Sequence, residues 1–378
     1  MTGLTPGSAR AASVLRSADA NQLLTLQAEG KIAGPVPREV VQMQLQYAHR
    51  RRARLPLRAD AARIGMWGSN NIDSYIYAMN KKGTKVLGTI DTAANGCYSP
   101  VTIKIDHKQN IWVGCEELDV TYPAEFGGEQ EYSSSGSVQR SYAFDASKFC
   151  GSAYSYCVAD SFDGGWDGAG HVFAELSSGD TVINRTVYYL NPGFYWWNSN
   201  EPSGPGTFIR ASGYCRPVCA VDFMDTDRSG NIWFDFSTSS QGSKGYGGLG
   251  EVTNPTTSPK IKIALPAGTY GSAGGVYVSG HGSVLNVTDQ ESRETYQYRL
   301  PVTRMSAPFN VLGPTLEKYS IEGRPVSGGF NKTESAFALA DLTWIDIGKL
   351  PANRWSMSPM ADCADNPCLG VGYTPSDK

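Results

Sequence analysis

The feature that most constrains the fold of this chain is a short motif that recurs along the sequence. In each clear copy an aspartate stands four residues before an asparagine or a histidine, and an apolar run follows directly. Aspartate supports a tight turn through its side chain, and glycine or asparagine tolerates a positive φ. Each copy therefore predicts a strand, a tight polar turn and a second strand. The clear copies are IDHKQNIWV at 105–113, WDGAGHVFA at 166–174 and TDRSGNIWF at 226–234.

The spacing of the motif indicates how the strands are organised. Two weaker copies follow at 279–287 and 331–339, and residues 63–67 look like a sixth second strand without its turn. The second strands begin 47, 61, 60, 52 and 52 residues apart, counted from Ile64, Ile111, Val172, Ile232, Val284 and Ala336. Each interval holds about four short strands with their loops, as a propeller blade does. The sequence therefore predicts an all-β fold, a six-bladed β-propeller, whose strand near residue 64 completes a blade with C-terminal strands and closes the ring.

Residues 1–62 differ in composition from residues 63–378. They contain no cysteine and no tryptophan, and their apolar residues recur at three- and four-residue spacing in 14–26 and 40–48. That spacing predicts two short helices. The run HRRRAR at 49–54 fits either a solvated helix end or a polyanion contact or processing site. We therefore expect a partly helical N-terminal extension at 1–62 and a propeller with a C-terminal tail at 63–378.

The eight cysteines indicate an oxidised protein. Six of them form three close pairs in the sequence, and the remaining two lie in adjacent predicted strands. Even numbers of closely spaced cysteines are typical of disulfides in exported proteins. A zinc site is the alternative, but the chain has four histidines and no C-x-x-C motif. The expected disulfides are Cys97–Cys115, Cys150–Cys157, Cys215–Cys219 and Cys363–Cys368, the last of which would tie down the tail.

Charge and hydropathy limit the partners that we expect. The 33 basic and 36 acidic residues give a net charge of −3, so a nucleic-acid-binding face over the whole molecule is not expected. The chain has no run of about 18 apolar residues, so no membrane span is expected. Residues 1–10 lack the apolar core of a secretory leader. Because of the cysteine pattern, we nevertheless expect a secreted or periplasmic protein whose leader has been removed.

The repeated units resemble NHL repeats, and the stretch 63–357 resembles the six-bladed propellers of the NHL and gluconolactonase-like superfamily. The resemblance implies a central channel with ligand-binding loops at one face of the ring. In that family the second strand of a blade often ends in an acid. The family includes lactonases, lyases and pure binding modules, so the resemblance does not select a chemistry. The matching acids in this chain are Glu116, Glu175, Asp235, Asp289 and Asp341.

These acids have two interpretations. If they converge at the channel mouth, they would hold a hard cation such as Ca²⁺, and Glu175, Asp235, Asp289 and Asp341 are the candidate ligands. The enzymes of the family hold their metal with a glutamate, two amide side chains and an aspartate, a set that this sequence does not match residue by residue. The alternative is that each acid caps its own loop by accepting backbone N–H bonds. The segment 225–230 likewise fits either the first half of a calcium loop or an ordinary hairpin turn.

An aromatic run at 188–197 is the strongest candidate for ligand binding. Aromatic faces on a rigid rim can stack on sugars or on other flat ligands. Adjacent residues of a strand point to opposite faces, so Trp196 and Trp197 cannot both face one ligand, and one of them is expected in the core. The candidate ligand-binding residues are Tyr195, Trp196 and Trp197, together with the amide pair Asn70 and Asn71.

No catalytic set accompanies these candidates. The G-x-G-x-x-G run at 245–250 precedes a strand and a turn instead of a helix, and neither G-x-S-x-G nor H-E-x-x-H occurs. His107, His171 and His281 lie in or beside equivalent turns, on the face opposite to the acids. We therefore expect an exported binding module that recognises a carbohydrate, peptide or protein partner through its channel-mouth loops. A calcium-dependent hydrolase or lyase acting at the channel is one alternative, and assembly through residues 1–62 is another.

Overall fold

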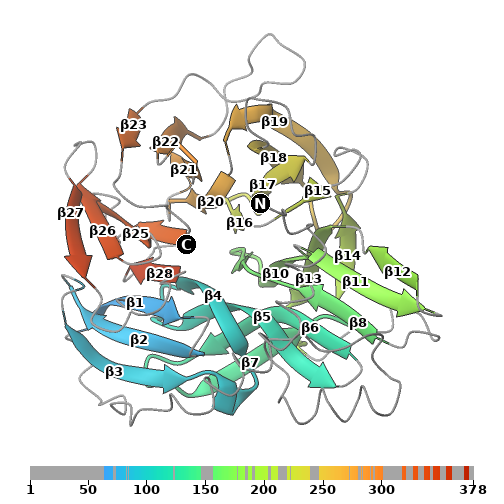
Figure 1. The fold of residues 1–378 in the computed structure, drawn as a ribbon, viewed down its shortest axis with the longest axis horizontal. Coiled ribbons are helices and arrows are strands. Elements are labelled where there is room, and N and C mark those ends of the chain that lie inside the picture. Colours follow the sequence, from blue (N-terminus) through green and yellow to red (C-terminus); the bar gives the residue numbers. More distant parts are fainter. Residues whose placement is uncertain are drawn as a thin grey trace, which may run out of the picture.

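Figure 1 shows the computed structural model of the chain, in which strands follow one another around a common centre. The described residues form strands joined by turns, with one short 3-10 helix, η2 (Ala93–Asn95), and no α-helix among them. The all-β prediction is confirmed. The residues that the structure describes are 64–70, 74–81, 83, 85–121, 124–145, 156–176, 178–183, 186–189, 192–202, 206–211, 219–221, 223–238, 247–271, 273–279, 282, 284–289, 291–292, 294–300, 317–320, 327–330, 336–340, 344–349, 355–359 and 370–373.

The described strands form six sheets. The first has the order β28 (Gly370–Tyr373), β1 (Ile64–Asn70), β2 (Tyr75–Asn80), β3 (Val86–Asp91). The second is β12 (Thr186–Tyr189), β11 (Ser178–Ile183), β8 (Tyr156–Asp160), β6 (Ala124–Tyr132), β5 (Ile111–Thr121), β4 (Tyr98–Ile105), with β7 (Val138–Ala143) paired to β6. The third is β14 (Thr207–Arg210), β13 (Gly193–Asn198), β10 (His171–Leu176), β9 (Gly164–Trp166). The fourth is β15 (Cys219–Ala220), β17 (Ile232–Thr238), β18 (Gly247–Thr253), β19 (Lys260–Tyr270), with β16 (Met224–Thr226) paired to β17. The fifth is β20 (Ala273–Val278), β21 (Val284–Asp289), β22 (Glu294–Arg299), β23 (Glu317–Ser320), and the sixth is β24 (Ser327–Phe330), β25 (Ala336–Ala340), β26 (Trp344–Lys349), β27 (Trp355–Pro359).

The sheets are arranged as a propeller around a common centre (Figure 1), and their inner strands are β28, β4, β9, β16, β20 and β24. Among these inner strands, β16 contacts β9 and β20, β24 contacts β20 and β28, and β28 contacts β4. The strand β28 pairs antiparallel with β1, with Val371 opposite Gly68. The predicted closure of the ring by a C-terminal strand on the first sheet is therefore confirmed.

The sheets are less uniform than the predicted units of four strands. The second sheet has seven strands, because β8 pairs in parallel with β6 and brings β11 and β12 with it. In the fourth sheet the inner strand is divided into β15 and β16, which both pair with β17. The prediction of equal four-stranded units is wrong here. The extra strands lie in the two longest intervals of the repeat, 111–172 and 172–232, which contain more residues than a unit of four strands needs.

The aspartates of the repeated motif build the turns between first and second strands. Oδ1 of Asp106 accepts the backbone N–H groups of Lys108 and Asn110, both at 2.8 Å. Its Oδ2 accepts the side-chain amide of Asn110 at 3.0 Å and the indole N–H of Trp112 at 3.2 Å. One carboxylate thus accepts hydrogen bonds both from the backbone of the turn and from a buried indole N–H. The equivalent groups are Asp167 with Ala169 and His171, and Asp227 with Ser229, Asn231 and Trp233.

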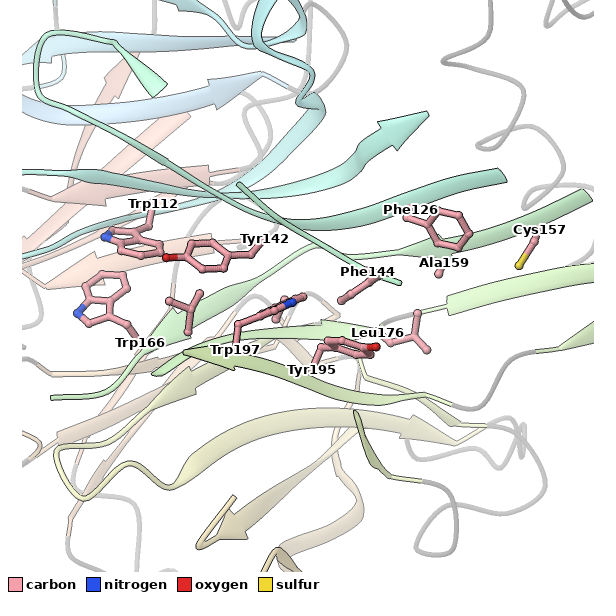
Figure 2. Packing of buried hydrophobic residues seen from close by; sticks show 12 residues of the cluster. Trp112, Phe126, Tyr142, Phe144, Cys157, Ala159, Trp166, Leu176, Tyr195 and Trp197 are labelled. Carbon is pink, nitrogen blue, oxygen red and sulfur yellow. The ribbon is translucent and has the colours of Figure 1, made fainter. Parts of the chain in front are cut away.

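Apolar side chains of neighbouring sheets pack against each other and form the core. Between the second and third sheets, the rings of Trp112 and Trp166 stack with centroids 5.2 Å apart (Figure 2). Between the third and fourth sheets, Phe194 and Phe234 meet edge to face at 4.8 Å. A sheet of this kind is apolar on both faces, so packing against two neighbours removes both faces from water.

Both ends of the chain lie largely outside the described residues. The expected helices of residues 1–62 lie outside the described residues, and so does most of the tail after residue 359. Within the part of the chain that is described, no helix has the length and apolar character needed to cross a membrane.

Candidate functional site

The acids at the ends of the second strands bind the backbone of their own sheets. Glu175 of β10 is fully buried, and its Oε1 accepts the N–H of Phe162 at 2.6 Å and that of Asp163 at 3.0 Å. Asp235 of β17 is also buried and accepts the N–H of Phe223 at 2.7 Å. In both sheets the donors belong to the segment that leads into the inner strand. These contacts are the ones that the capping interpretation predicts.

Asp289 at the end of β21 follows the same rule. Its Oδ2 accepts the N–H of Gly271 at 2.8 Å, just before β20, and its Oδ1 accepts the N–H groups of Glu291 and Ser292 at 3.0 and 3.3 Å. Glu116 is buried in β5. Asp341 lies outside the described residues.

Of the residues predicted to hold Ca²⁺, the three that the structure describes, Glu175, Asp235 and Asp289, do not fit such a site. Calcium takes six to eight oxygen ligands that converge on one point. No three His, Cys, Asp or Glu side chains are placed to share a metal ion within the described ranges. Glu175, Asp235 and Asp289 direct carboxylate oxygens at backbone donors of their own sheets. Asn70 is fully buried in β1, and Asn71 lies outside the described residues. No reaction step through calcium follows from this arrangement.

The inner strands carry a buried ionic cluster that the sequence reasoning missed. The Nζ of Lys104, in β4, lies 2.6 Å from Oδ1 of Asp163, just before β9. It also donates to the carbonyl oxygen of Gly164 and, at 2.7 Å, to that of Met224 in β16. Oδ1 of Asp225, also in β16, lies 3.7 Å from the same nitrogen. We call Lys104, Asp163, Asp225 and the nearby Glu129 of β6 the central cluster.

The two aspartates extend the central cluster to further strands. Asp163 accepts the hydroxyl of Thr102 at 2.8 Å on one oxygen and the N–H of Met224 at 3.1 Å on the other. Asp225 accepts the N–H of Val278, in β20, at 2.7 Å. The cluster therefore joins the inner strands of four consecutive sheets, β4, β9, β16 and β20.

The environment of the central cluster decides which groups are charged. Burial by itself would lower the pKa of Lys104, but the nearby carboxylates of Asp163 and Asp225 outweigh it and raise that pKa above its ordinary value. Burial raises the pKa of Asp163, and Lys104 opposes the rise. Burial also raises the pKa of Glu129 well above its ordinary value, with a smaller contribution from Asp163. Lys104 is thus an ammonium ion facing two carboxylates, while Glu129 resists ionisation.

The central cluster is suited to holding strands together and not to chemistry. A lysine that acts as a nucleophile or base must lose its proton, and the carboxylates around Lys104 oppose that loss. The acceptors near its Nζ come from two other segments, 163–164 at β9 and 224–225 in β16. Oε1 of Glu129 has no hydrogen-bond partner in the part of the chain described. The glutamate side chain instead lies against Gly164, where any β-carbon would overlap it.

The sequence contains a signal that would have found this cluster. Lys104 and Asp225 each stand two residues before the aspartate of their turn, and Gly165 holds the same place in the copy between them. A lysine and an aspartate thus occupy the same position in two copies of the repeat, and the copy between them has a glycine there. This pattern predicts an ion pair between the two inner strands.

The aromatic candidates fall on two faces of β13. Tyr195 is fully buried and Trp197 is 2% exposed, and both belong to the core between the second and third sheets (Figure 2). Trp196 is half-buried on the opposite face, where its ring meets that of His171 edge to face at 5.3 Å. The predicted separation of Trp196 and Trp197 onto opposite faces is confirmed. Of the three, Trp196 has the largest exposed surface for a ligand.

The two described histidines, His107 and His171, lie in or beside the turns of the repeated motif. Nδ1 of His171 lies 2.7 Å from Oδ2 of Asp167, the position that an asparagine amide takes in the two equivalent turns. His107 is exposed in its turn. His281 lies outside the described residues. The segment at 225–230 is an inner strand followed by a hairpin turn, in which Asp227 accepts backbone N–H groups.

One predicted disulfide is confirmed. Cys97 and Cys115 are bonded with an S–S distance of 2.04 Å and join the start of the second sheet to β5. Cys157 in β8 is also disulfide-bonded, and its partner lies outside the described residues, as do Cys150, Cys215, Cys363 and Cys368. The side chain of Cys219 lies outside them too. No cysteine is free in the portion that the structure describes.

Comparison with known proteins supports the architecture. No protein-family model matches the chain, and no curated protein sequence matches it. A chain from the crystal structure of a nidogen–laminin complex is similar with a TM-score of 0.53 and 9% identity, covering 83% of this chain and 99% of that one. Regucalcin from Agrobacterium tumefaciens, a calcium-binding protein, has a TM-score of 0.43 and 10% identity, covering 69% and 74%. A protein from Lactobacillus plantarum has a TM-score of 0.44 and 11% identity, covering 82% and 99%. At 9% identity, the likeness to the nidogen–laminin chain shows a shared propeller fold and says nothing about function.

Proposed function

We propose that this chain is a binding module that recognises a carbohydrate, peptide or protein partner through loops at the mouth of its central channel. The observation that carries the proposal is that the described ionisable groups near the centre are engaged by the fold itself. The central cluster joins inner strands, and Glu175, Asp235 and Asp289 accept backbone N–H groups. An enzyme needs groups that are free to change protonation or to hold a metal.

Three further features belong to this proposal. We propose that the six sheets are six blades of a propeller of the NHL and gluconolactonase-like kind, which the repeat and the sheet order support. We propose that the protein is secreted or periplasmic, which the Cys97–Cys115 disulfide supports. The similar chain of the nidogen–laminin complex comes from an assembly of two proteins, which makes a protein the first ligand class to test.

The test is a binding screen of the full chain on immobilised glycans, peptides and extracellular proteins, followed by melting of the free and ligand-bound protein. A true ligand raises the melting temperature, whereas calcium or a chelator leaves it unchanged. Trp196→Ala is the informative variant for an aromatic contact, with Tyr98→Ala, a half-buried ring on another sheet, as its control. Turnover of a screened compound together with chelator-sensitive melting would contradict the proposal.

A further inference from the structure

A recess on the outer side of the ring lies between the third and fourth sheets, far along the sheets from the inner strands. It has a volume of about 600 Å³ and is bordered by Phe208, Ile209 and Arg210 of β14 and by residues 259–262 at the start of β19. Pockets of this size are common in ligand-binding proteins. We call this recess, with these lining residues, the rim groove.

The base of the rim groove is apolar and fixed. Ile209 is buried and Ile261 is half-buried, and both pack on the core cluster that contains Phe194 and Phe234. Phe208 is half-buried against the neighbouring cluster. The groove therefore presents apolar surface that needs no rearrangement before a ligand can cover it.

The edges of the rim groove are cationic. Arg210, Lys260 and Lys262 are exposed, and no acid is among the lining residues. Lys262 lies 3.7 Å from Glu251 and is partly neutralised. Arg210 and Lys260 have no carboxylate within ion-pair distance in the part of the chain described. In a chain with a net charge of −3, this is a local concentration of positive charge beside an apolar surface.

Both strands at the rim groove are the outer strands of their sheets. Within the described strands, β14 pairs only with β13, and β19 pairs only with β18. Each has a row of backbone N–H and C=O groups on its outer side that can accept another strand. Lys260 and Lys262 stand two residues apart, so they project from the same face of β19, and Ile261 projects from the other face.

We propose that the rim groove binds an extended acidic segment of a partner protein, which adds as a strand to the outer edge of β19. Acidic residues at alternate positions would meet Lys260 and Lys262, and the apolar residues between them would face Ile261 and Ile209. The N-terminal part of this chain is a poor occupant, because its HRRRAR run at 49–54 is itself cationic. This site goes beyond the proposed function, since it lies on the rim and does not use the channel mouth.

The first experiment measures binding of fluorescent peptides to the full chain by anisotropy. The probe is an alternating Glu-Val peptide, compared with a Lys-Val peptide and with the Glu-Val peptide N-methylated at alternate residues. We expect the acidic probe to bind, its affinity to fall as salt screens the charges, and both comparison peptides to bind about tenfold more weakly or worse. Equal binding of the N-methylated probe would overturn strand addition, and tighter binding of single-stranded oligonucleotides would overturn the peptide assignment.

The second experiment assigns the binding to the rim groove. The double variant Arg210→Glu with Lys260→Glu should weaken the acidic probe about tenfold or more at low salt. Arg299→Glu, an exposed arginine in β22, is the control and should leave affinity unchanged. If the charge reversal does not fold, Arg210→Gln with Lys260→Gln should give a smaller loss in a folded protein. Equal affinity in variants and parent would overturn the proposal, whereas unchanged binding of a channel-mouth ligand to the double variant leaves the proposed function standing.

Discussion

Lys104 shows why a buried charge stabilises a fold only while its partners remain. Its side chain is 12% exposed, and it faces Asp163, whose side chain is fully buried. Removing such charges from water is costly, and the attraction between them returns that free energy only when the geometry is good. Lys104 also donates hydrogen bonds to the carbonyl oxygens of Gly164 in β9 and Met224 in β16. Loss of the lysine would therefore leave these carbonyl groups unpaired as well as the carboxylates.

We therefore expect Lys104→Met to lower the free energy of unfolding by about 3 to 5 kcal/mol, the usual cost of removing one partner of a buried pair. The variant leaves the carboxylates of Asp163 and Asp225 without their cation. Urea unfolding followed by tryptophan fluorescence measures the change. Lys108→Met, at an exposed lysine in the following turn, is the matched control. Equal denaturation midpoints for the two variants would show that the central cluster does not hold the inner strands.

Glu129 gives the pH dependence that the central cluster predicts. Its folded pKa lies well above the ordinary value of 4.5, because burial and Asp163 oppose its charge. Above about pH 4.5 the unfolded chain has lost this proton while the folded chain still holds it, so rising pH favours unfolding. The cost grows by about 1.4 kcal/mol per pH unit until the folded pKa is reached.

Glu129→Gln removes that proton and should flatten the fall in stability above pH 4.5. The stability gained over the parent should grow with pH, which melting curves between pH 5 and pH 8 would measure. Glu201→Gln, at an exposed glutamate, is the control and should follow the parent. Parallel stability profiles for parent and Glu129→Gln would contradict a proton held by the folded state.

At the scale of elements, the turn aspartates explain why the hairpins form at these positions. Asp227 accepts two backbone N–H groups of its turn, at 2.8 and 3.0 Å, and the indole N–H of Trp233 at 3.1 Å. Trp233 is 1% exposed, so its indole N–H depends on this carboxylate within the described structure. Asp227 thus stabilises the turn and also provides the hydrogen-bond acceptor that the indole N–H of Trp233 needs in the core.

Asp227→Ala should lower the free energy of unfolding by about 2 to 4 kcal/mol, because it leaves a buried indole N–H and turn donors without an acceptor. Chemical denaturation measures the loss. Ser229→Ala, an exposed residue of the same turn whose backbone N–H remains, should change little. A loss for Asp227→Ala no larger than that for Ser229→Ala would mean that water replaces the carboxylate.

These turns also show how much the sequence could predict. An aspartate, its asparagine or histidine four residues later and the apolar strand after it interact locally, so the hairpins follow from the sequence. Alternation along β13 likewise predicts that Trp196 and Trp197 face opposite sides. Alternation does not say which sides are covered, and the burial of Tyr195 and Trp197 depends on rings from another sheet. The parallel pairing of β8 with β6 joins residues far apart in the chain, which no local pattern encodes. The contact of Lys104 with Met224 is also long-range, and only a comparison of equivalent positions in the repeat points to it.

At the scale of the whole molecule, the ring is complete only when both ends of the described chain meet. The strand β28 supplies the inner strand of the first sheet and pairs with β1 at four positions, from Met66 opposite Tyr373 to Ser69 opposite Gly370. It also contacts β4 and β24, the inner strands on either side. Without β28, buried Met66 and Trp67 would lie at an open sheet edge.

Ending the chain at residue 369 should therefore destabilise the ring, and ending it at residue 373 should not. Loss of four backbone pairings, at about 0.5 to 1.5 kcal/mol each, predicts a decrease of about 2 to 6 kcal/mol in the free energy of unfolding. The shorter chain should also expose Trp67, which a red shift in tryptophan emission before the main transition would reveal. Both truncations remove the last five residues, 374–378, so the difference between them isolates β28, whose four residues pair with β1. If the two truncated chains unfold at the same denaturant concentration, the ring is held by its inner strands and by packing between sheets, and its closure by β28 contributes little.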